Sequence, residues 1–358
     1  MNTSPTTPTT PAAVPKRIGI FRALMLGDML CATPALRAVA SAWPGAELVL
    51  IGLRWARPLA ERLPMVHRFI EFPGWPGLPE TPTTHVALPG FLHAMQSERF
   101  DLLLQLHGSG RIVNPLLAAC APRRLVGFTP GGADDGVIGA AADRAPWPEQ
   151  GHEVERLLAL TDHLRLPRQG TQLQFPLRPG DRVALRQQWP ALEDPQPFVV
   201  VHPGARLASR RWMPASFASV ADRIAARGFR VVLTGGESEQ ALTAEVRGLM
   251  KHPALDLAGR TDLWTLGALI ERAALLVCND TGVSHIAAAL ATPSVVISCG
   301  ADASRFAPQD VLRHATLWQP APCRPCHHDR CPSGHECATT LPLQAVDHAV
   351  RQRLGVPA

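Results

Sequence analysis

The chain has 358 residues, which is enough for two domains of ordinary size with well-filled cores. Its hydrophobic fraction of 46% is ordinary for a soluble protein, and no apolar run is long enough to cross a membrane. The formal net charge of +5 is mild, and basic residues do not alternate with aromatic ones, so nucleic acid is not an expected partner. A mild positive charge is more consistent with an anionic membrane surface or an anionic glycolipid as the partner.

The chain begins with fifteen residues, Met1–Pro15, that are rich in threonine and proline. They lack the apolar stretch of a signal peptide. We expect residues 1–15 to be a disordered tail and the protein to stay in the cytoplasm.

After this tail, apolar runs alternate with helical patterns in the rhythm of a parallel β–α sheet. The predicted elements of the first half are strands Arg17–Arg22, Glu47–Gly52 and Asp101–Leu106, and helices Asp28–Trp43 and Ile112–Cys120. Two long stretches rich in proline or glycine interrupt them, Phe72–Gly90 and Thr129–Gln150. Such stretches in a compact domain are usually lids, binding loops or disorder.

The rhythm restarts after Pro167–Pro197, a proline-rich, polar stretch that is the natural hinge. The predicted elements that follow are strands Pro195–Val201, Arg230–Leu233, Ala273–Cys278 and Pro293–Ser298, and helices Phe217–Arg227, Leu263–Arg272 and Ile286–Leu290. The simplest architecture is a pair of α/β domains with parallel sheets facing across a cleft. We place an acceptor-binding domain at residues 16–175 and a nucleotide-sugar-binding domain, with a cysteine cluster over 323–337, at residues 176–341. A helix over 342–358 ends the chain.

The polar heptapeptide Asn279–His285 stands where a buried strand turns into a helix. Free backbone N–H groups and the positive end of a helix dipole collect at such a place, and open α/β sheets bind anionic ligands there. Thr281 and Ser284 add hydroxyl donors, and Gly282 lets a phosphate approach the backbone. The alternative is a helix N-cap without a ligand.

Two more loops follow strand ends in the same half of the chain. His202–Ala205 leads into Ser209–Trp212, and Thr234–Glu237 follows the next strand. Since the carboxyl ends of parallel strands lie side by side, we expect these loops and the heptapeptide to meet at one crevice. Arg210 or Arg211 could neutralise a diphosphate there. Taken alone, the arginine pair is as consistent with a solvated loop.

The first half supplies a carboxylate in Gly27-Asp28, after the first predicted strand. As a bare residue, Asp28 is most simply the N-cap of the next helix. At the edge of a nucleotide cleft, however, the same carboxylate suits a general base that takes a proton from an attacking hydroxyl.

Five motifs follow one another in a fixed order along the chain: Gly27–Leu30 with Thr33–Arg37, His152–Arg156, His202–Ala205 with Arg211–Pro214, Leu233–Glu237, and Asn279–His285. Together they resemble glycosyltransferase family 9, which contains the ADP-heptose:lipopolysaccharide heptosyltransferases. The likeness runs from about Arg17 to Cys337. It implies the GT-B fold, in which two Rossmann-like domains face each other and the second binds the donor.

The resemblance also implies an inverting transfer, without a metal, of heptose from ADP-heptose to a lipopolysaccharide core hydroxyl. Asp28 would be the general base. The donor-binding residues would be Ser209, Arg210, Glu237, Thr261, Asp280, Thr281, Gly282 and His285, with Glu237 on the ribose. Arg210 falls where many relatives have a phosphate-binding lysine, and an arginine changes the contact from a point to a fork. The enzyme would act at the inner face of the inner membrane, in peripheral contact with it.

Four of the eight cysteines form a dense cluster, Cys323-x2-Cys326-x4-Cys331-x5-Cys337. Four such thiols in a cytoplasmic chain favour a structural zinc or iron site over disulfides. Labile disulfides or free thiols are the alternative. Cys323–His327 also matches the c-type haem pattern, but haem attachment needs export.

Two other functions fit parts of this pattern. The chain could bind nucleotide sugars without catalysis, although an intact Asp28 beside three donor loops speaks against it. A sugar-nucleotide epimerase shares the architecture but would carry other acid and base motifs. The sequence does not identify the acceptor, which could be lipopolysaccharide core, another glycan or a protein. We expect the first domain and its loops Phe72–Gly90 and Thr129–Gln150 to select it, and loop sequences do not encode such a choice legibly.

Overall fold

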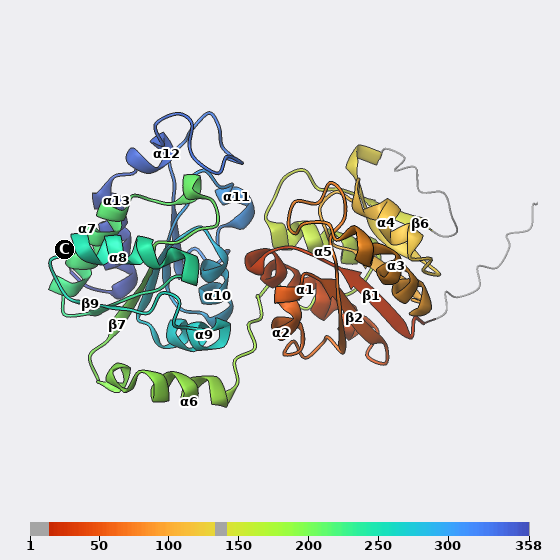
Figure 1. The fold of residues 1–358 in the computed structure, drawn as a ribbon, viewed down its shortest axis with the longest axis horizontal. Coiled ribbons are helices and arrows are strands. Elements are labelled where there is room, and N and C mark those ends of the chain that lie inside the picture. Colours follow the sequence, from red (N-terminus) through yellow and green to blue (C-terminus); the bar gives the residue numbers. More distant parts are fainter. Residues whose placement is uncertain (1–13, 133–141, 358) are drawn as a thin grey trace, which may run out of the picture. The chain divides into compact units, whose positions relative to one another are not determined.

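The computed structural model describes residues 14–132 and 142–357 (Figure 1). The predicted tail over residues 1–15 therefore lies almost wholly outside the described residues. The middle of the predicted loop Thr129–Gln150 lies outside them as well. Within the described residues, no helix combines the length and the apolarity needed to cross a bilayer.

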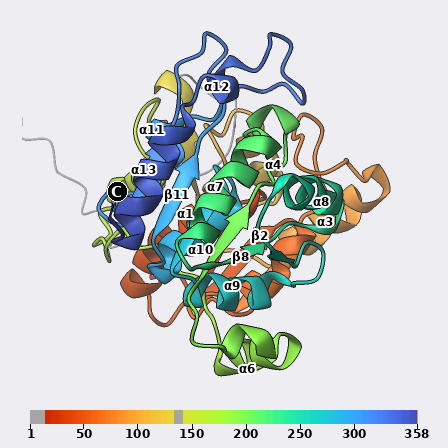
Figure 2. The same ribbon diagram turned by 90° about the vertical axis from the view of Figure 1, so that its left-hand side faces the viewer.

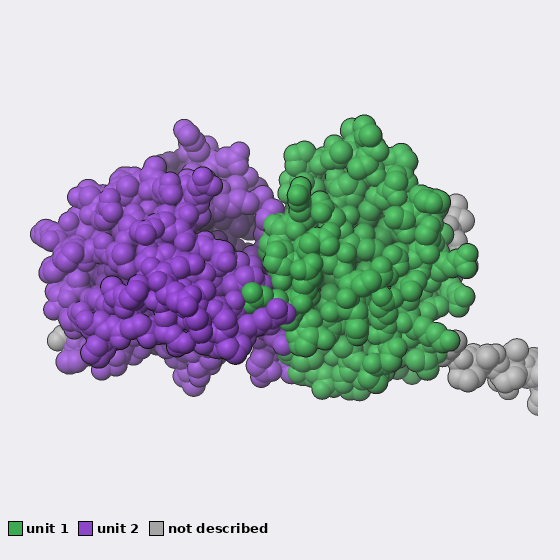
Figure 3. Space-filling model, turned by 60° about the horizontal axis from the view of Figure 1, so that its bottom comes forward, with its two compact units in different colours: residues 1–23, 36–147, 160–169 green, residues 24–35, 148–159, 170–358 purple. Residues whose placement is uncertain are grey.

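The chain divides into two compact units, each assembled from separate segments (Figure 3). Unit 1 comprises residues 1–23, 36–147 and 160–169, and unit 2 comprises residues 24–35, 148–159 and 170–358. The helices α1 (Leu26–Ala42) and α5 (Glu153–His163) each begin in unit 2 and end in unit 1. The first turn of α1, which carries Asp28, thus belongs to unit 2.

Unit 1 contains a six-stranded parallel sheet with the order β3-β2-β1-β4-β5-β6. Its strands are β1 (Arg17–Phe21), β2 (Glu47–Gly52), β3 (Arg68–Glu71), β4 (Leu102–Gln105), β5 (Leu125–Thr129) and β6 (Ala142–Pro146). The helices α2 (Arg57–Ala60), α3 (Leu88–Ser97) and α4 (Val113–Ala119) lie between them. The prediction that Thr129–Gln150 is irregular is wrong at β6, which pairs with β5. The charged residues of β6 lack the apolar pattern by which a strand is recognised.

Unit 2 repeats the arrangement with the order β12-β11-β10-β7-β8-β9, again parallel throughout. Its strands are β7 (Phe198–His202), β8 (Arg230–Leu233), β9 (Ala254–Asp256), β10 (Leu275–Asn279), β11 (Ser294–Ile297) and β12 (His314–Leu317). Its helices are α6 (Pro179–Gln188), α7 (Pro214–Ala226), α8 (Gln240–Leu249), α9 (Leu263–Arg272), α10 (Gly282–Leu290), α11 (Ala303–Phe306), α12 (Glu336–Thr339) and α13 (Leu343–Leu354).

The sheet of unit 2 is covered by helices on both faces (Figure 2). Its central strands are apolar throughout, as expected for parallel strands buried on both sides. Alternate residues such as Val199, Val277 and Val295 form one core with helices α7, α8 and α13. Helices α9 and α10 lie side by side and pack on the other face. This rigid layer fixes the positions of the loops at the strand ends.

Two predicted boundaries are wrong for identifiable reasons. The hinge Pro167–Pro197 contains helix α6, which begins at Pro179 and is capped where Asp181 Oδ2 accepts the Arg178 N–H at 2.7 Å. Helix α10 begins at Gly282, four residues before the predicted Ile286, so the second half of the heptapeptide is helical. In both helices the first residues are not part of an apolar periodic pattern, so the pattern does not indicate where the helix begins.

Candidate functional site

A cavity of about 170 Å³ lies in unit 2, where the loops after β7, β10 and β11 meet the first turn of α1. In this parallel sheet the strand order reverses between β7 and β10, since β8 and β9 follow on one side of β7 and β10 to β12 on the other. Open α/β sheets bind their ligands at such a switch point. Six of the predicted site residues line the cavity: Asp28, Arg210, Asp280, Thr281, Gly282 and His285. The structure thus brings together a carboxylate, a guanidinium and a helix amino terminus.

The amino terminus of α10 opens at this cavity. Thr281 occupies the N-cap position in an extended conformation, and its side chain makes no capping hydrogen bond. Gly282 is the first helical residue, so the positive end of the helix dipole faces the lining. Ser284, expected as a ligand donor, is buried, and its hydroxyl donates to the Thr281 carbonyl at 2.8 Å. That expectation is wrong because the helix itself uses this hydroxyl.

The buried side chain of Asn279 ties two of the loops together. Its Nδ2 donates to the Pro203 carbonyl at 2.7 Å, and its Oδ1 accepts the Trp212 N–H at 2.9 Å. Since a buried amide without partners would be destabilising, both contacts hold the loop after β7 against the end of β10. The loop that carries Arg210 is fixed in this way.

Asp280 and Arg210 give the cavity its charges. Asp280 Oδ2 accepts the Ser298 hydroxyl at 3.0 Å. Burial raises the pKa of Asp280, while this hydrogen bond and the charges of Arg210 and Arg324 act to lower it. Arg210 Nη2 donates to the Cys326 carbonyl at 2.9 Å, but its Nε is buried without a hydrogen-bond partner among the described residues. Because Arg210 also lines the cavity, its positive charge fits an anionic ligand there.

His285 contributes an uncharged imidazole. Burial lowers the pKa of His285 to about 4, so the ring is neutral at pH 7. Its Nδ1 lies 3.7 Å from the Cys31 sulfur, and the ring meets Phe306 edge-on with centroids 6.5 Å apart. The imidazole can therefore donate or accept one hydrogen bond but supplies no positive charge.

Asp28 lies in the first turn of α1, two residues after its start at Leu26. It is therefore not the N-cap that its position before an apolar pattern suggested. A Cβ on Gly282 would lie 3.1 Å from the Leu26 side chain, so the amino termini of α1 and α10 meet closely. Asp28 consequently stands in the same lining as Thr281 and Arg210.

Three predicted donor residues are not part of this lining. Ser209 is buried, and its hydroxyl donates to the His328 carbonyl at 2.5 Å. Glu237 is exposed at the start of a short 3-10 turn, Glu237–Glu239, and Thr261 precedes α9. The donor-binding roles of these three residues stay predictions.

The sequence reasoning missed other residues near the site. Arg206 and Phe306 line the cavity, the first in the loop after β7 and the second at the end of α11. The carboxylate of Glu239, rather than Glu237, accepts the Gly236 N–H at 2.8 Å and lies 3.8 Å from His202 Nε2. Because the carboxyl ends of parallel strands lie side by side, the loop after β11 could also have been predicted to reach the site. The predicted motifs, however, ended at His285.

The cysteine cluster belongs to a segment that packs beside the cavity. Cys326 N–H donates to the Gly300 carbonyl at 2.6 Å, and the Cys326 carbonyl holds Arg210. Burial raises the pKa of Cys337, and the neighbouring thiols of Cys323, Cys326 and Cys331 add to this rise. Within the described residues, however, no three His, Cys, Asp or Glu side chains form a group that could hold a metal ion. The structure therefore does not support the predicted metal site.

Two parallel sheets in the Rossmann strand order, with a cavity at the switch point of the second, define a doubly wound α/β protein. The family model for glycosyltransferase family 9 (heptosyltransferase) matches residues 90–336. Because this is more than half of the chain, the protein belongs to that family and is a glycosyltransferase.

Curated relatives and solved structures agree with this assignment. Lipopolysaccharide heptosyltransferase 3 of Escherichia coli K12 is 26% identical over 273 residues, which cover 75% of this chain and 78% of that protein. The structure of E. coli ADP-heptose lps heptosyltransferase II matches with a TM-score of 0.71 and 21% identity, covering 95% and 98% of the two chains. The structure of E. coli heptosyltransferase WaaC with ADP matches with a TM-score of 0.66 and 18% identity, covering 94% of this chain and 99% of that chain. The predicted α/β fold of GT-B type is confirmed.

Proposed function

We propose that this glycosyltransferase moves a heptose from ADP-heptose to a hydroxyl of a lipopolysaccharide core, with inversion and without a metal. The observation that carries the proposal is the cavity itself, where Asp28 shares one lining with Arg210 and the amino terminus of α10. The sugar and the acceptor come from the names of similar proteins, which include a lipopolysaccharide heptosyltransferase and an ADP-heptose lps heptosyltransferase. A further heptosyltransferase of this fold was solved with ADP.

The proposed binding mode follows from the charges of the lining. The donor diphosphate would lie against the Gly282 end of α10 and accept hydrogen bonds from its free N–H groups. The guanidinium of Arg210, which lines the cavity, would pair with a phosphate oxygen. Arg206 adds a second positive charge at the same lining. Together these groups would stabilise the negative charge of the leaving diphosphate.

The proposed reaction places Asp28 opposite this diphosphate. The acceptor hydroxyl would attack the anomeric carbon from the face away from the diphosphate. The new C–O bond forms while the bond from the anomeric carbon to the phosphate oxygen breaks, which inverts the configuration. Asp28 would take the hydroxyl proton, and the electron pair of the broken bond stays on the ADP. The neutral His285 would hold a sugar hydroxyl by a hydrogen bond without adding charge.

The experiment that tests this proposal has a binding arm and a transfer arm. Isothermal titration with ADP and UDP measures the choice of nucleotide. ADP-heptose is then incubated with a lipopolysaccharide core that lacks its heptose, and mass spectrometry and NMR report the product and its anomeric configuration. Binding of ADP without transfer to core, other glycans or protein would leave a nucleotide-sugar-binding protein as the function. Release of an altered nucleotide sugar would instead indicate an epimerase.

We also propose that the protein works in the cytoplasm, in peripheral contact with the inner face of the inner membrane. The net charge of +5 and the proposed lipid-linked acceptor support this location. Sedimentation with anionic vesicles, compared with neutral vesicles, tests it. Equal recovery in both supernatants would contradict the membrane contact.

We keep a structural zinc or iron ion at Cys323, Cys326, Cys331 and Cys337 as a separate proposal. Four thiols within fifteen residues of sequence support it, as does their mutual effect on the pKa of Cys337. The described geometry does not bring three of them to one point, so a bound ion would require the segment to rearrange. The ion would have no role in the transfer.

A further inference from the structure

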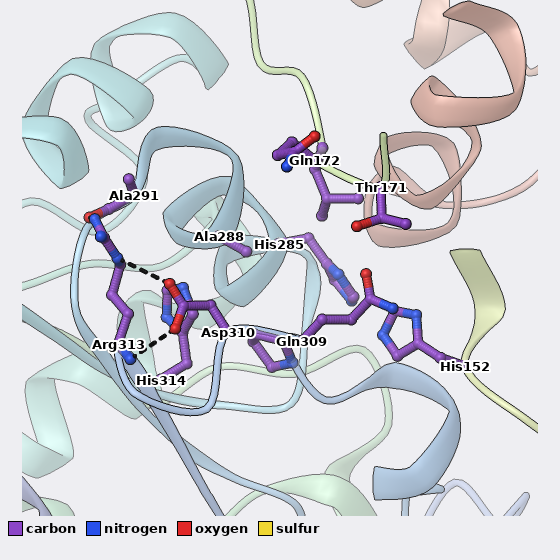
Figure 4. Close-up of a pocket in the computed structure, with 12 residues that line it drawn as sticks. His152, Thr171, Gln172, His285, Ala288, Ala291, Gln309, Asp310, Arg313 and His314 are labelled. Carbon is purple, nitrogen blue, oxygen red and sulfur yellow. Dashed lines mark hydrogen bonds and ion pairs between the residues drawn. The ribbon is translucent and has the colours of Figure 1, made fainter. Parts of the chain in front are cut away.

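The motif His152–Arg156 has no part in the proposed transfer. His152 directly precedes α5 and Glu153 is its first residue, and both belong to unit 2. His152 and His285 point into one cavity of about 400 Å³ (Figure 4). Burial is the main cause of the low pKa of His285, but the neighbouring His152 lowers this pKa further and the charge of Glu153 acts to raise it. The start of α5 therefore lies close to α10.

The carboxylate of Glu153 holds a residue of α11. Only 1% of the Glu153 side chain is exposed. Its Oε2 accepts a hydrogen bond from Nε of Arg305 at 2.8 Å, and Nη1 of Arg156 lies 3.9 Å from the same oxygen. Because a buried carboxylate is strongly unfavourable without a paired cation, the position of Arg305 depends on that of Glu153.

His152 holds the same helix two residues further along. The Val154 N–H donates to Nδ1 of His152 at 3.2 Å, which leaves Nε2 to donate to the Ala307 carbonyl at 2.9 Å. Ala307 directly follows α11. Two consecutive side chains of the motif thus hold the residues on either side of Phe306.

Two further contacts fix the ring of Phe306. The first turn of α11 is capped by Asp302, whose Oδ1 accepts the Ser304 N–H at 3.0 Å and the Ser304 hydroxyl at 2.6 Å. The guanidinium of Arg305 lies 4.8 Å from the centroid of the Phe306 ring, a cation–π contact. Since Glu153 holds this guanidinium, it also restricts the ring that the guanidinium covers.

Phe306 lines the proposed donor cavity together with Asp28. Its ring stands nearly perpendicular to the His285 ring, with centroids 6.5 Å apart. The His285 ring lies in turn against Gly27, the residue before Asp28. In the proposed reaction the anomeric carbon lies between the leaving diphosphate and Asp28. The transferred sugar would therefore occupy the part of the cavity that Phe306 and His285 border.

We propose that Phe306 is a specificity-determining residue that packs against the transferred sugar of the donor, and that His152 and Glu153 are positioning residues that hold it through α11. This rests on the proposed function, because the ligand is taken to be a nucleotide sugar. The C–H groups on one face of a neutral pyranose ring can pack on an aromatic ring. His152 and Glu153 contact α11 and act on the sugar only through Phe306.

Isothermal titration of the full chain with ADP-heptose and with ADP distinguishes a sugar contact from a nucleotide contact. Phe306→Leu should weaken ADP-heptose binding about threefold to tenfold, because the aromatic packing is lost, and ADP binding by no more than about twofold. Phe306→Tyr keeps the ring and should retain the affinity for ADP-heptose. Glu153→Gln removes the charge that holds Arg305 and should also weaken ADP-heptose binding selectively, about threefold.

The matched control for Glu153→Gln is Glu271→Gln. It disrupts the ion pair of Glu271 with Arg182, at 2.6 Å between α9 and α6 of the same unit. This control should change thermal stability at most and leave both affinities unaltered. If Glu153→Gln does not fold, Arg305→Lys replaces it, since lysine keeps a cation for Glu153 but loses the planar group over the ring. The same selective loss is expected.

The outcomes separate the two proposals. Equal losses of ADP-heptose and ADP affinity in Phe306→Leu would overturn the sugar contact while the donor site stands. A selective loss in Phe306→Leu without one in Glu153→Gln or Arg305→Lys would overturn the positioning role of α5. If the wild-type protein binds neither ligand, the proposed function itself fails.

Discussion

Gly27 and His285 approach so closely that a Cβ atom on Gly27 would lie 2.5 Å from Cδ2 and 2.9 Å from Nε2 of the imidazole. Both residues belong to unit 2, one in the first turn of α1 and the other in α10. Only a glycine permits this distance, which real Cβ atoms essentially never show. The contact sets how near Asp28 stands to the amino terminus of α10.

Gly27→Ala should therefore impair turnover and stability together. The backbone of α1 or the buried ring must move, at a cost of about 1–3 kcal/mol in the free energy of unfolding. Gly180→Ala is the matched control, since Gly180 is also the second residue of its helix and has nothing within 4 Å of its Cβ position. That control should be neutral or slightly stabilising. In a double-mutant cycle, His285→Ala should make Gly27→Ala harmless to stability, and additive effects would contradict the contact.

Asp28→Asn should lower kcat by about 10²–10⁴-fold, because the amide cannot take the acceptor proton. The affinity for ADP should change little, since the proposed phosphate ligands lie on α10 and Arg210. Single-turnover kinetics and isothermal titration measure the two quantities. Unchanged turnover would remove the assignment of Asp28 as general base, and an equal loss of ADP affinity would make it a binding residue instead.

Arg210→Met should weaken ADP binding about tenfold or more, the effect of one charge-assisted hydrogen bond. Adenosine, which lacks the diphosphate, should bind equally to both proteins. Arg210→Lys should recover part of the ADP affinity, because it restores the charge but not the fork. A parallel loss for ADP and adenosine would instead mean that Arg210 only holds the Cys326 segment in place.

The apolar parallel strands were predictable from the sequence. Runs such as Phe198–His202 and Leu275–Asn279 are buried on both faces, so their composition alone identifies them. The strand β6 was not predictable in this way. It lies at the edge of its sheet, where charged side chains are tolerated, and it therefore has no apolar run. Helix α6 was hidden for a related reason: it is largely solvent-exposed, and a proline opens it.

The site was predictable where motifs follow strand ends. Asp280, Thr281 and Gly282 line the cavity because the end of β10 lies at the switch point. The choice between Glu237 and Glu239 depends on which side chain a short turn directs toward the loop after β7, and sequence spacing does not contain that information. The cavity of about 400 Å³ in unit 2 was equally unpredictable, since its lining comes from four segments far apart in the chain: His152, residues 171–173, residues 285–291 and residues 308–314.

Acid should destabilise the fold between about pH 6.5 and pH 4. Burial lowers the pKa of four histidines below the ordinary 6.5, so the unfolded chain binds protons in this window that the folded chain does not: His152, His202, His285 and His314. Their contribution to stability is complete above pH 6.5 and is lost as the pH falls toward 4. The raised pKa of Asp280 makes the fold more stable as the pH falls, but this is one group against four histidines.

Urea unfolding at pH 7.5 and pH 5.0 measures this effect. We expect the free energy of unfolding to fall by on the order of 2 kcal/mol or more. His314→Asn keeps a hydrogen-bonding partner for the Ser294 hydroxyl and should make the pH dependence shallower. At this site Asp310 favours the protonated ring, while Arg313 and Arg353 oppose it. Stability that is equal at both pH values would contradict the neutral buried state.

The proposed metal at the cysteine cluster leads to a prediction for the metal content and for ADP binding, because the Cys326 carbonyl holds Arg210. Protein purified without oxygen should contain about one zinc or iron ion per chain. Removal of the ion by a chelator should leave ADP binding intact, because the contact of Arg210 with the Cys326 carbonyl is present in the described geometry, where no three ligands meet. Cys331→Ser should lower the metal content, whereas Cys120→Ser, at a buried thiol on the other unit, should leave it unchanged. Absence of both metals, with all four thiols reacting freely with a thiol reagent, would show that the cluster is held by packing alone.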